Sequence, residues 1–298
     1  MDSIAEISRL SLTASEEKLL NTSTQIYTNR PTGNHMVFNH SILCQVGLPR
    51  SKVTGNEFMR RSGDAWLNVQ AGYLDLGKGP VLQTIPYGTM PRLALAWIST
   101  YAKRNKTREI PIGESASQFL QLLGMDSQGG RHSKLREQMH ALAACRMQLG
   151  FNGSTFNGQP VDQFDAWIPS ITNQQRALWS GRIVLSEAYF AEIMENGVPL
   201  DSRALNALKG SALAIDIYSW LAHRLYRIES RPVIIHWKSL KEQFGQEYQG
   251  KDADKDFKKQ FLKQLQNVQA AYPQARIKQM KGAVMLLKSP PPIPHKSL

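Results

Sequence analysis

The 298-residue sequence contains few cysteines and no long apolar run. Its two cysteines, Cys44 and Cys145, are far apart and form no CxxC pair, which argues against a disulfide framework or a cysteine-based zinc site and is typical of a reducing compartment. The start lacks the basic flank and apolar stretch of a signal peptide. The longest apolar runs, such as Leu93–Ile98, are too short to span a bilayer. We therefore expect a cytoplasmic protein with no membrane partner.

Patterns that indicate catalysis are also missing. The seven histidines form no HxH or HExxH pattern, so neither a metal nuclease nor a metal-dependent nickase is supported. Gly245–Asp252 (GQEYQGKD) approaches a P-loop, but Asp252 stands where Ser or Thr is required, and a carboxylate there would repel phosphate. We predict no catalytic residue, no metal and no cofactor. An ATPase or a nuclease is the third functional hypothesis, supported only by this near-P-loop.

What the sequence does contain is positive charge. Lys and Arg number 36 against 24 Asp and Glu, a formal net charge of +12. Such an excess favours polyanionic partners, usually nucleic acid. A basic protein whose charges are simply solvated would have the same composition, so the placement of the charges has to decide.

Two stretches of the chain repeat one order of elements. Each begins with an apolar helix that contains a tryptophan, Trp97 or Trp220, and each has a second helix that ends at a glycine, Gly124 or Gly245. These landmarks recur at offsets of 123 and 121 residues. The first stretch has a helix at 92–103, a strand at 109–112, helices at 115–123 and 131–145, and a strand at 146–151 before the hairpin turn Asn152-Gly153. The second has a helix at 211–227, a strand at 232–236, helices at 239–244 and 254–272, and hairpin strands at 275–280 and 284–288.

Helix, strand, helix, turn, helix and hairpin is the order of a winged helix. We therefore predict an α+β fold with tandem winged-helix domains and an N-terminal extension. The expected divisions are an extension of unknown role (1–85), a first winged-helix domain with added linker elements (86–197), a second winged-helix domain (198–288) and a disordered Pro-rich tail (289–298). Within these divisions the sequence indicates a helix around residues 15–21, a strand at 182–186, a helix at 187–195 and a linker at Pro199.

A winged helix lays its third helix in the major groove of DNA, and its hairpin reaches phosphates or the minor groove. The helix at 254–272 suits this role, because Phe257, Phe261, Leu265, Val268 and Tyr272 share one side and a lysine row at i, i+4 and i+8 the other. The row costs about 0.2–0.5 kcal/mol per pair in repulsion, which a polyanion would relieve. The expected DNA contacts of this copy are Lys251, Lys255, Lys258, Lys259, Lys263, Gln266, Arg276, Lys278 and Lys281. A solvated lysine face is the alternative.

The corresponding helix of the first copy is less basic. Leu135, Met139 and Leu142 form its inward stripe. Its outward face mixes groups that suit base edges, Arg for guanine and Glu for cytosine. The expected DNA contacts are Arg131, His132, Ser133, Lys134, Arg136, Glu137 and His140. A solvated surface of mixed charge is again the alternative.

Four segments resemble the plasmid-encoded RepA-type replication initiators, a family of iteron-binding winged-helix proteins. The segments are Pro86–Arg92 (PYGTMPR), Glu109–Gly124 (EIPIGESASQFLQLLG), Gly129–Cys145 (GGRHSKLREQMHALAAC) and Val198–Arg227 (VPLDSRALNALKGSALAIDIYSWLAHRLYR). The likeness covers roughly residues 86–288 and leaves out the extension and the tail. Each segment is longer than a short catalytic signature, so a chance match is less expected.

The resemblance implies sequence-specific binding to tandem repeats in double-stranded DNA at a plasmid origin. It also implies opening of an adjacent AT-rich segment and recruitment of host replication proteins such as the helicase. Many such initiators repress their own promoters as dimers, so a homodimer is a further expected state. The family supplies no catalytic residue. A winged-helix transcriptional repressor without initiator activity is the alternative function, because both need helices that enter a groove.

Overall fold

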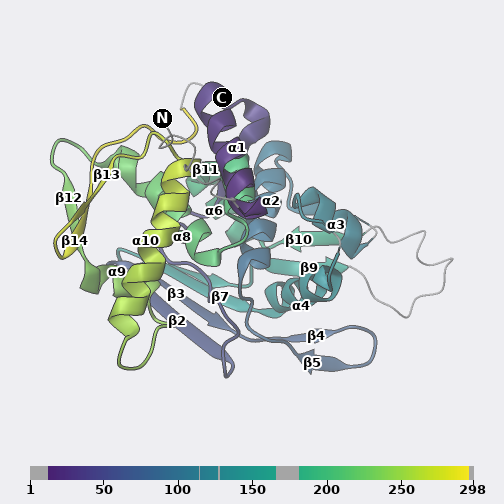
Figure 1. Ribbon diagram of the computed structural model, residues 1–298. Coiled ribbons are helices and arrows are strands. Elements are labelled where there is room, and N and C mark those ends of the chain that lie inside the picture. Colours follow the sequence, from purple (N-terminus) through teal and green to yellow (C-terminus); the bar gives the residue numbers. More distant parts are fainter. Residues whose placement is uncertain (1–12, 114, 127, 166–180, 295–298) are drawn as a thin grey trace.

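A computed structural model describes residues 13–113, 115–126, 128–165 and 181–294 of the chain. The fold is mixed α+β, with helices packed around several small antiparallel sheets (Figure 1). No described helix is both long enough and apolar enough to cross a membrane.

The first copy of the predicted order begins at α2. Its elements are α2 (Thr89–Asn105), β6 (Glu109–Pro111), α3 (Ala116–Leu122), α4 (Arg131–Ala144), β7 (Arg146–Phe151), β8 (Ser154–Gly158), β9 (Val161–Asp165) and β10 (Arg182–Leu185). Strands β6, β10 and β9 form a three-stranded sheet with β10 in the centre. The strand between the first two helices thus pairs with the last strand of the copy.

The second copy has the same sheet order. Its elements are α8 (Ala212–Arg224), η2 (Leu225–Arg227), β12 (Val233–His236), α9 (Trp237–Phe244), α10 (Ala253–Ala271), β13 (Ile277–Met280) and β14 (Ala283–Leu286). They form the sheet β12-β14-β13, again with the last strand in the centre. Trp97 meets Phe119 edge-on at 5.4 Å between ring centroids, and Trp220 meets Phe244 edge-on at 5.3 Å. The duplicated element order is therefore confirmed, and the structure adds an aromatic contact between the first two helices of each copy.

The hairpin predicted for the first copy forms, but it joins a different sheet from the one that contains β6. Asn152 and Gly153 adopt positive φ angles at its turn, and β7 then pairs with β3 (Ala65–Gln70), which pairs with β2 (Glu57–Ser62). The result is the four-stranded sheet β2-β3-β7-β8. Gly150 lies opposite Trp66, and a Cβ there would be 2.0 Å from the indole nitrogen. In place of this hairpin, β9 and β10 complete the three-stranded sheet of the copy.

The N-terminal extension is folded into the body of the protein. Besides β2 and β3 it contains α1 (Ala14–Thr28), η1 (Gly33–His35), β1 (Met36–Asn39), β4 (Tyr73–Asp75) and β5 (Pro80–Leu82). The helix expected around residues 15–21 is confirmed and runs longer. Thr13 and Glu16 form a capping box at its start, which satisfies two backbone N–H groups.

Two smaller predictions were wrong. Pro199 lies opposite Phe38 in β11 (Val198–Asp201), which pairs with β1, so it belongs to a sheet and not to a linker. The first part of the Pro-rich tail is packed, because Ile293 is buried against Met36 and Phe38, and the hydroxyl of Tyr272 donates to the Pro290 carbonyl at 2.5 Å. The strand and helix expected at 182–195 are confirmed as β10 and α6 (Glu187–Asn196), and α7 (Ser202–Leu208) follows β11.

Both copies share one apolar core, and buried charges join them. Arg92 on α2 donates two hydrogen bonds to Asp216 on α8, at 2.7 and 2.8 Å. Arg60 on β2 donates to Glu247, in the turn between α9 and α10, at 2.5 Å. Arg50 contacts both carboxylates. These ion pairs connect the extension, the first copy and the second copy, so they help to set the orientation of α4 relative to α10.

Candidate nucleic-acid interface

Helix α10 has the two faces that its sequence predicts. Phe257, Phe261, Leu265, Val268 and Tyr272 are each at most 5% exposed. Their rings and aliphatic groups pack on α8 and α9, with Trp237 meeting Phe261 edge-on at 5.7 Å. The opposite face is polar and exposes Lys255, Lys259, Lys263 and Gln266, and Lys251 is exposed in the turn before the helix. Lys258 is half-buried, with its ammonium group 5.2 Å from the centre of the Trp237 ring.

The hairpin β13-β14 adds charge after this helix. Arg276, Lys278 and Lys281 are all exposed, and Lys281 stands beside Gly282 in the turn, where φ is 82°. A short basic hairpin that follows a basic helix is the arrangement that places side chains near phosphates.

Helix α4 presents its polar groups only at its N-terminal half. Ser133, Lys134, Arg136 and Glu137 are exposed, whereas Arg131 and His132 are half-buried. His132 shares a hydrogen bond of 2.9 Å with the hydroxyl of Ser117, and Arg131 pairs with Asp126. The stripe Leu135, Met139 and Leu142 is buried, as the helical period predicts.

The structure corrects the prediction that His140 contacts DNA. Its spacing places it on the outward face, but the residue is only 7% exposed and its ring meets Phe164 of β9 edge-on at 5.7 Å. Burial, with a smaller contribution from the positive charge of Arg136, lowers the pKa of His140 to about 4. A neutral side chain covered by β9 cannot reach DNA, so we remove His140 from the candidate interface.

Sequence reasoning missed the part played by α1. Glu16 in its first turn lies close enough to Lys263 of α10 for the lysine to help lower the pKa of the carboxyl, after the larger effect of the Thr13 hydrogen bonds. Lys18, also on α1, lines a pocket together with Arg131 and Lys134 of α4. Helix α1 therefore lies near both the start of α4 and the lysine row of α10. No motif marks such a contact, since it joins segments more than a hundred residues apart.

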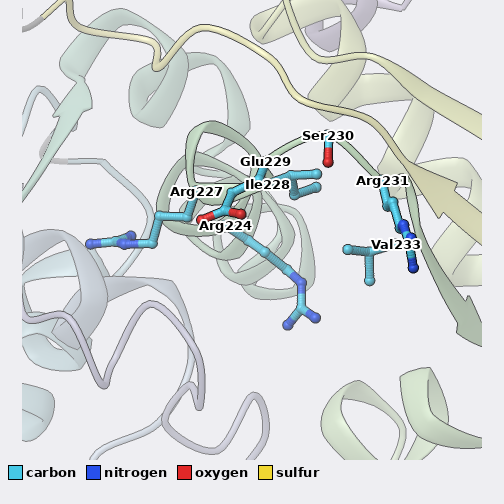
Figure 2. Close-up of a pocket in the computed structure, with 7 residues that line it drawn as sticks. All are labelled: Arg224, Arg227, Ile228, Glu229, Ser230, Arg231 and Val233. Atoms are coloured by element: carbon cyan, nitrogen blue, oxygen red, sulfur yellow. The ribbon is translucent and has the colours of Figure 1, made fainter.

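A second basic cluster lies where α8 ends and the chain continues towards β12. Arg224, Arg227 and Arg231 line a pocket of about 680 Å³ there, with Glu229 as its carboxylate. Figure 2 shows Arg224 and Arg227 extending in different directions and Arg231 beyond Glu229. The sequence offered no periodic signal for this cluster, because the three arginines come from a helix end, a 3-10 turn and a loop.

The near-P-loop is bound to arginines rather than open to phosphate. It follows helix α9, whereas a P-loop follows a strand. Burial by itself would raise the pKa of Glu247 in this loop, but Arg60 and Arg50 lower it below its usual range. The loop therefore carries a charged carboxylate held by two arginines, and this charge would repel a phosphate. Among the described residues, no group of three or more His, Cys, Asp or Glu side chains could hold a metal ion.

The duplicated helix–strand unit defines a mixed α+β protein, and the last helix of its second copy carries a strongly basic face. Residues 85–238 match the family described as plasmid encoded RepA protein. This match spans more than half of the chain, so the protein belongs to the plasmid-encoded RepA family, and the resemblance seen in the sequence is confirmed.

The fold is similar to two crystal structures of domains 2 and 3 of RctB. One, of a selenomethionine derivative, has a TM-score of 0.51 at 10% sequence identity and covers 83% of this chain and 98% of that chain. The other has a TM-score of 0.48 at 12% identity and covers 82% and 94%. At such low identity the likeness concerns the fold alone. No curated protein matches the sequence.

Proposed function

We propose that this plasmid replication protein is a sequence-specific, origin-binding initiator that acts without catalysis. In this proposal, residues 86–197 and 198–288 are two winged-helix domains that bind tandem repeats in double-stranded DNA. The protein then promotes local opening of the origin and recruits host replication proteins such as the helicase. Membership of the RepA family supports this function, since its initiators are generally non-catalytic DNA-binding proteins.

The observation that carries the proposal is the lysine row of α10. Lys255, Lys259 and Lys263 are exposed along one side of a 19-residue helix whose other side is core. Like charges so spaced repel one another, and a phosphate backbone alongside would turn that cost into attraction. Helix α4 occupies the same place in the first copy. Two such helices suit successive major grooves, about 34–36 Å apart on one side of the duplex.

Salt dependence of binding tests the role of the row. We expect replacement of Lys255, Lys259 and Lys263 with alanine to weaken binding to origin DNA. The slope of log K against log salt should fall in magnitude by about 0.9 per lost phosphate contact, or ~2.7 in all. Fluorescence anisotropy between 50 and 250 mM KCl measures this slope. A matched triple variant at Lys52, Lys78 and Lys288, which are also exposed, controls for net charge. An unchanged slope in the α10 variant would remove the row from the interface.

Arg136 of α4 tests base recognition. It is exposed and belongs to the outward face. If it contacts guanine through two hydrogen bonds, Arg136→Ala costs about 1–3 kcal/mol on the origin repeat and far less on an unrelated duplex. Competition binding with the two duplexes measures the difference. Equal weakening on both would mean that Arg136 contacts phosphate instead of a base.

The alternative, a winged-helix repressor without initiator activity, shares every surface described above. A plasmid that keeps the origin but lacks the gene separates the two functions. The initiator proposal requires that this plasmid fails to replicate until the gene is supplied in trans, and that footprinting shows protected repeats at the origin. Normal replication without the gene would leave the repressor function.

A further inference from the structure

A basic pocket lies between α1, the start of α4 and the end of α7. Its volume is about 570 Å³. Among the residues that the structure describes, five cationic side chains and one carboxylate, that of Asp126, line it. The cations are Lys18, Arg50, Arg131, Lys134 and Lys209. We call this cavity the junction pocket.

Two of these five cations pair with carboxylates of the described residues, and the other three do not. Arg50 pairs with Glu247 and Asp216, and Arg131 pairs with Asp126. Within the described part of the chain, no carboxylate forms an ion pair with Lys18, Lys134 or Lys209. The ammonium group of Lys209 donates to the carbonyl oxygen of Gly124, and that of Lys134 lies 5.6 Å from the centre of the Tyr87 ring.

Lys209 is held in an unfavourable position. Burial lowers its pKa, and the positive charges of Lys18 and Arg131 lower it further. Positive charges that lower one another's pKa cost free energy unless an anion offsets them. An anion between them would replace this repulsion by attraction and would favour the charged form of Lys209.

The start of α4 adds to the positive potential. Its N-cap is Gly130, which has no side chain to accept from the first backbone N–H groups. The positive end of this 14-residue helix therefore lies at its first turn, which contains Arg131 and Lys134. Uncapped N–H groups next to basic side chains are the arrangement that binds phosphate oxygens.

The position of the pocket indicates which phosphate it takes. Arg131 and Lys134 belong both to the pocket and to the candidate recognition helix α4. On the other side, Glu16 of α1 is within electrostatic reach of Lys263 in the α10 row. Helix α1 contacts α10 and lines the pocket together with the start of α4, so a DNA strand that contacts both helices would pass α1. We propose that the junction pocket binds a phosphodiester group of that strand; this inference rests on the proposed DNA-binding function.

The test uses the full-length protein and the double variant Lys18→Gln/Lys209→Gln. The control, Lys78→Gln/Lys288→Gln, removes the same charge from segments that do not line the pocket. We expect the pocket variant to bind origin DNA with a slope of log K against log salt about 0.9 smaller in magnitude, the value for one lost phosphate contact. The ratio of affinities for origin and unrelated duplexes should stay the same, because phosphates carry no sequence information. Urea unfolding of all three proteins verifies that they remain folded.

Three results would overturn the inference, each in a different way. If the wild type binds no DNA, the proposed function itself fails. If the wild type binds and the pocket variant has the slope of the control, the function stands and the pocket assignment fails. The same protein is also heated with inorganic phosphate and with ATP at millimolar concentrations. If these ligands stabilise the wild type but not the pocket variant while the DNA slopes agree, the pocket binds a free phosphate compound and not the DNA backbone.

Discussion

Replacing Asp216 with alanine should destabilise the protein more than almost any other single change to a charged residue. The carboxylate is 6% exposed and the guanidinium of Arg92 is 5% exposed. Two hydrogen bonds join them, at 2.7 and 2.8 Å. The remaining N–H groups of Arg92 donate to carbonyl oxygens of Leu48, Pro49 and Gly88. Without Asp216, Arg92 keeps these neutral acceptors but loses the counter-charge that offsets its burial.

The expected cost follows from that burial. Removing one partner of a buried ion pair typically costs about 3–5 kcal/mol, because the other charge remains uncompensated. The Arg108–Asp162 pair offers a matched comparison, with a separation of 2.6 Å but side chains that are 35% and 48% exposed. Solvent screens such a pair, so Asp162→Ala should cost at most about 1 kcal/mol.

Urea unfolding, followed by tryptophan fluorescence and far-ultraviolet circular dichroism, measures both costs. With a denaturant slope of about 3 kcal/mol per M, Asp216→Ala should lower the midpoint by more than 1 M, and Asp162→Ala by less than 0.4 M. The double change Arg92→Met/Asp216→Leu should recover part of the loss, since apolar residues of similar size need no counter-charge. If Asp216→Ala and Asp162→Ala cost the same, burial does not determine the strength of the Arg92 pair, and the reasoning is refuted.

Two further predictions concern packing and pH. Gly150→Ala should destabilise the four-stranded sheet, because the new Cβ would lie 2.0 Å from the indole nitrogen of Trp66. Gly158→Ala is the control, because its new Cβ would lie 3.4 Å from the edge of the Phe156 ring, which is an ordinary contact distance. Equal urea midpoints for the two variants would contradict the expected clash at Gly150. Stability should also fall between pH 7 and pH 5. Burial lowers the pKa of three histidines to about 4, so the unfolded state, with pKa near 6.5, binds more protons in that window. They are His40, His140 and His223. A urea midpoint independent of pH over this range would refute the assignment.

Elements with a strong local signal were predicted correctly. The 3.6-residue period of apolar side chains in α10 identified both its core face and its lysine face, because a helix arranges its side chains by spacing alone. The turn at Asn152-Gly153 was recognised for a similar reason. Asn and Gly tolerate positive φ angles, and this property does not depend on contacts with distant segments.

Partners distant in sequence were not predicted. Strand β7 was expected to serve as the wing of the first copy, yet it pairs with β3, about eighty residues earlier. An alternating strand specifies which of its faces is apolar, but not which other strand supplies its hydrogen bonds. For the same reason Pro199 looked like a linker, although its neighbours form a sheet with β1.

The sequence by itself determined the family, the duplicated order of elements and the amphipathic faces of α4 and α10, since each is evident from local residue patterns that need no knowledge of distant contacts. Tertiary structure alone decided which parts of those faces stay exposed. Strand β9 buries His140, and α1 brings Lys18 to the start of α4 and Glu16 to the lysines of α10. Burial and electrostatic contact depend on distances between segments, and only the folded chain specifies those distances.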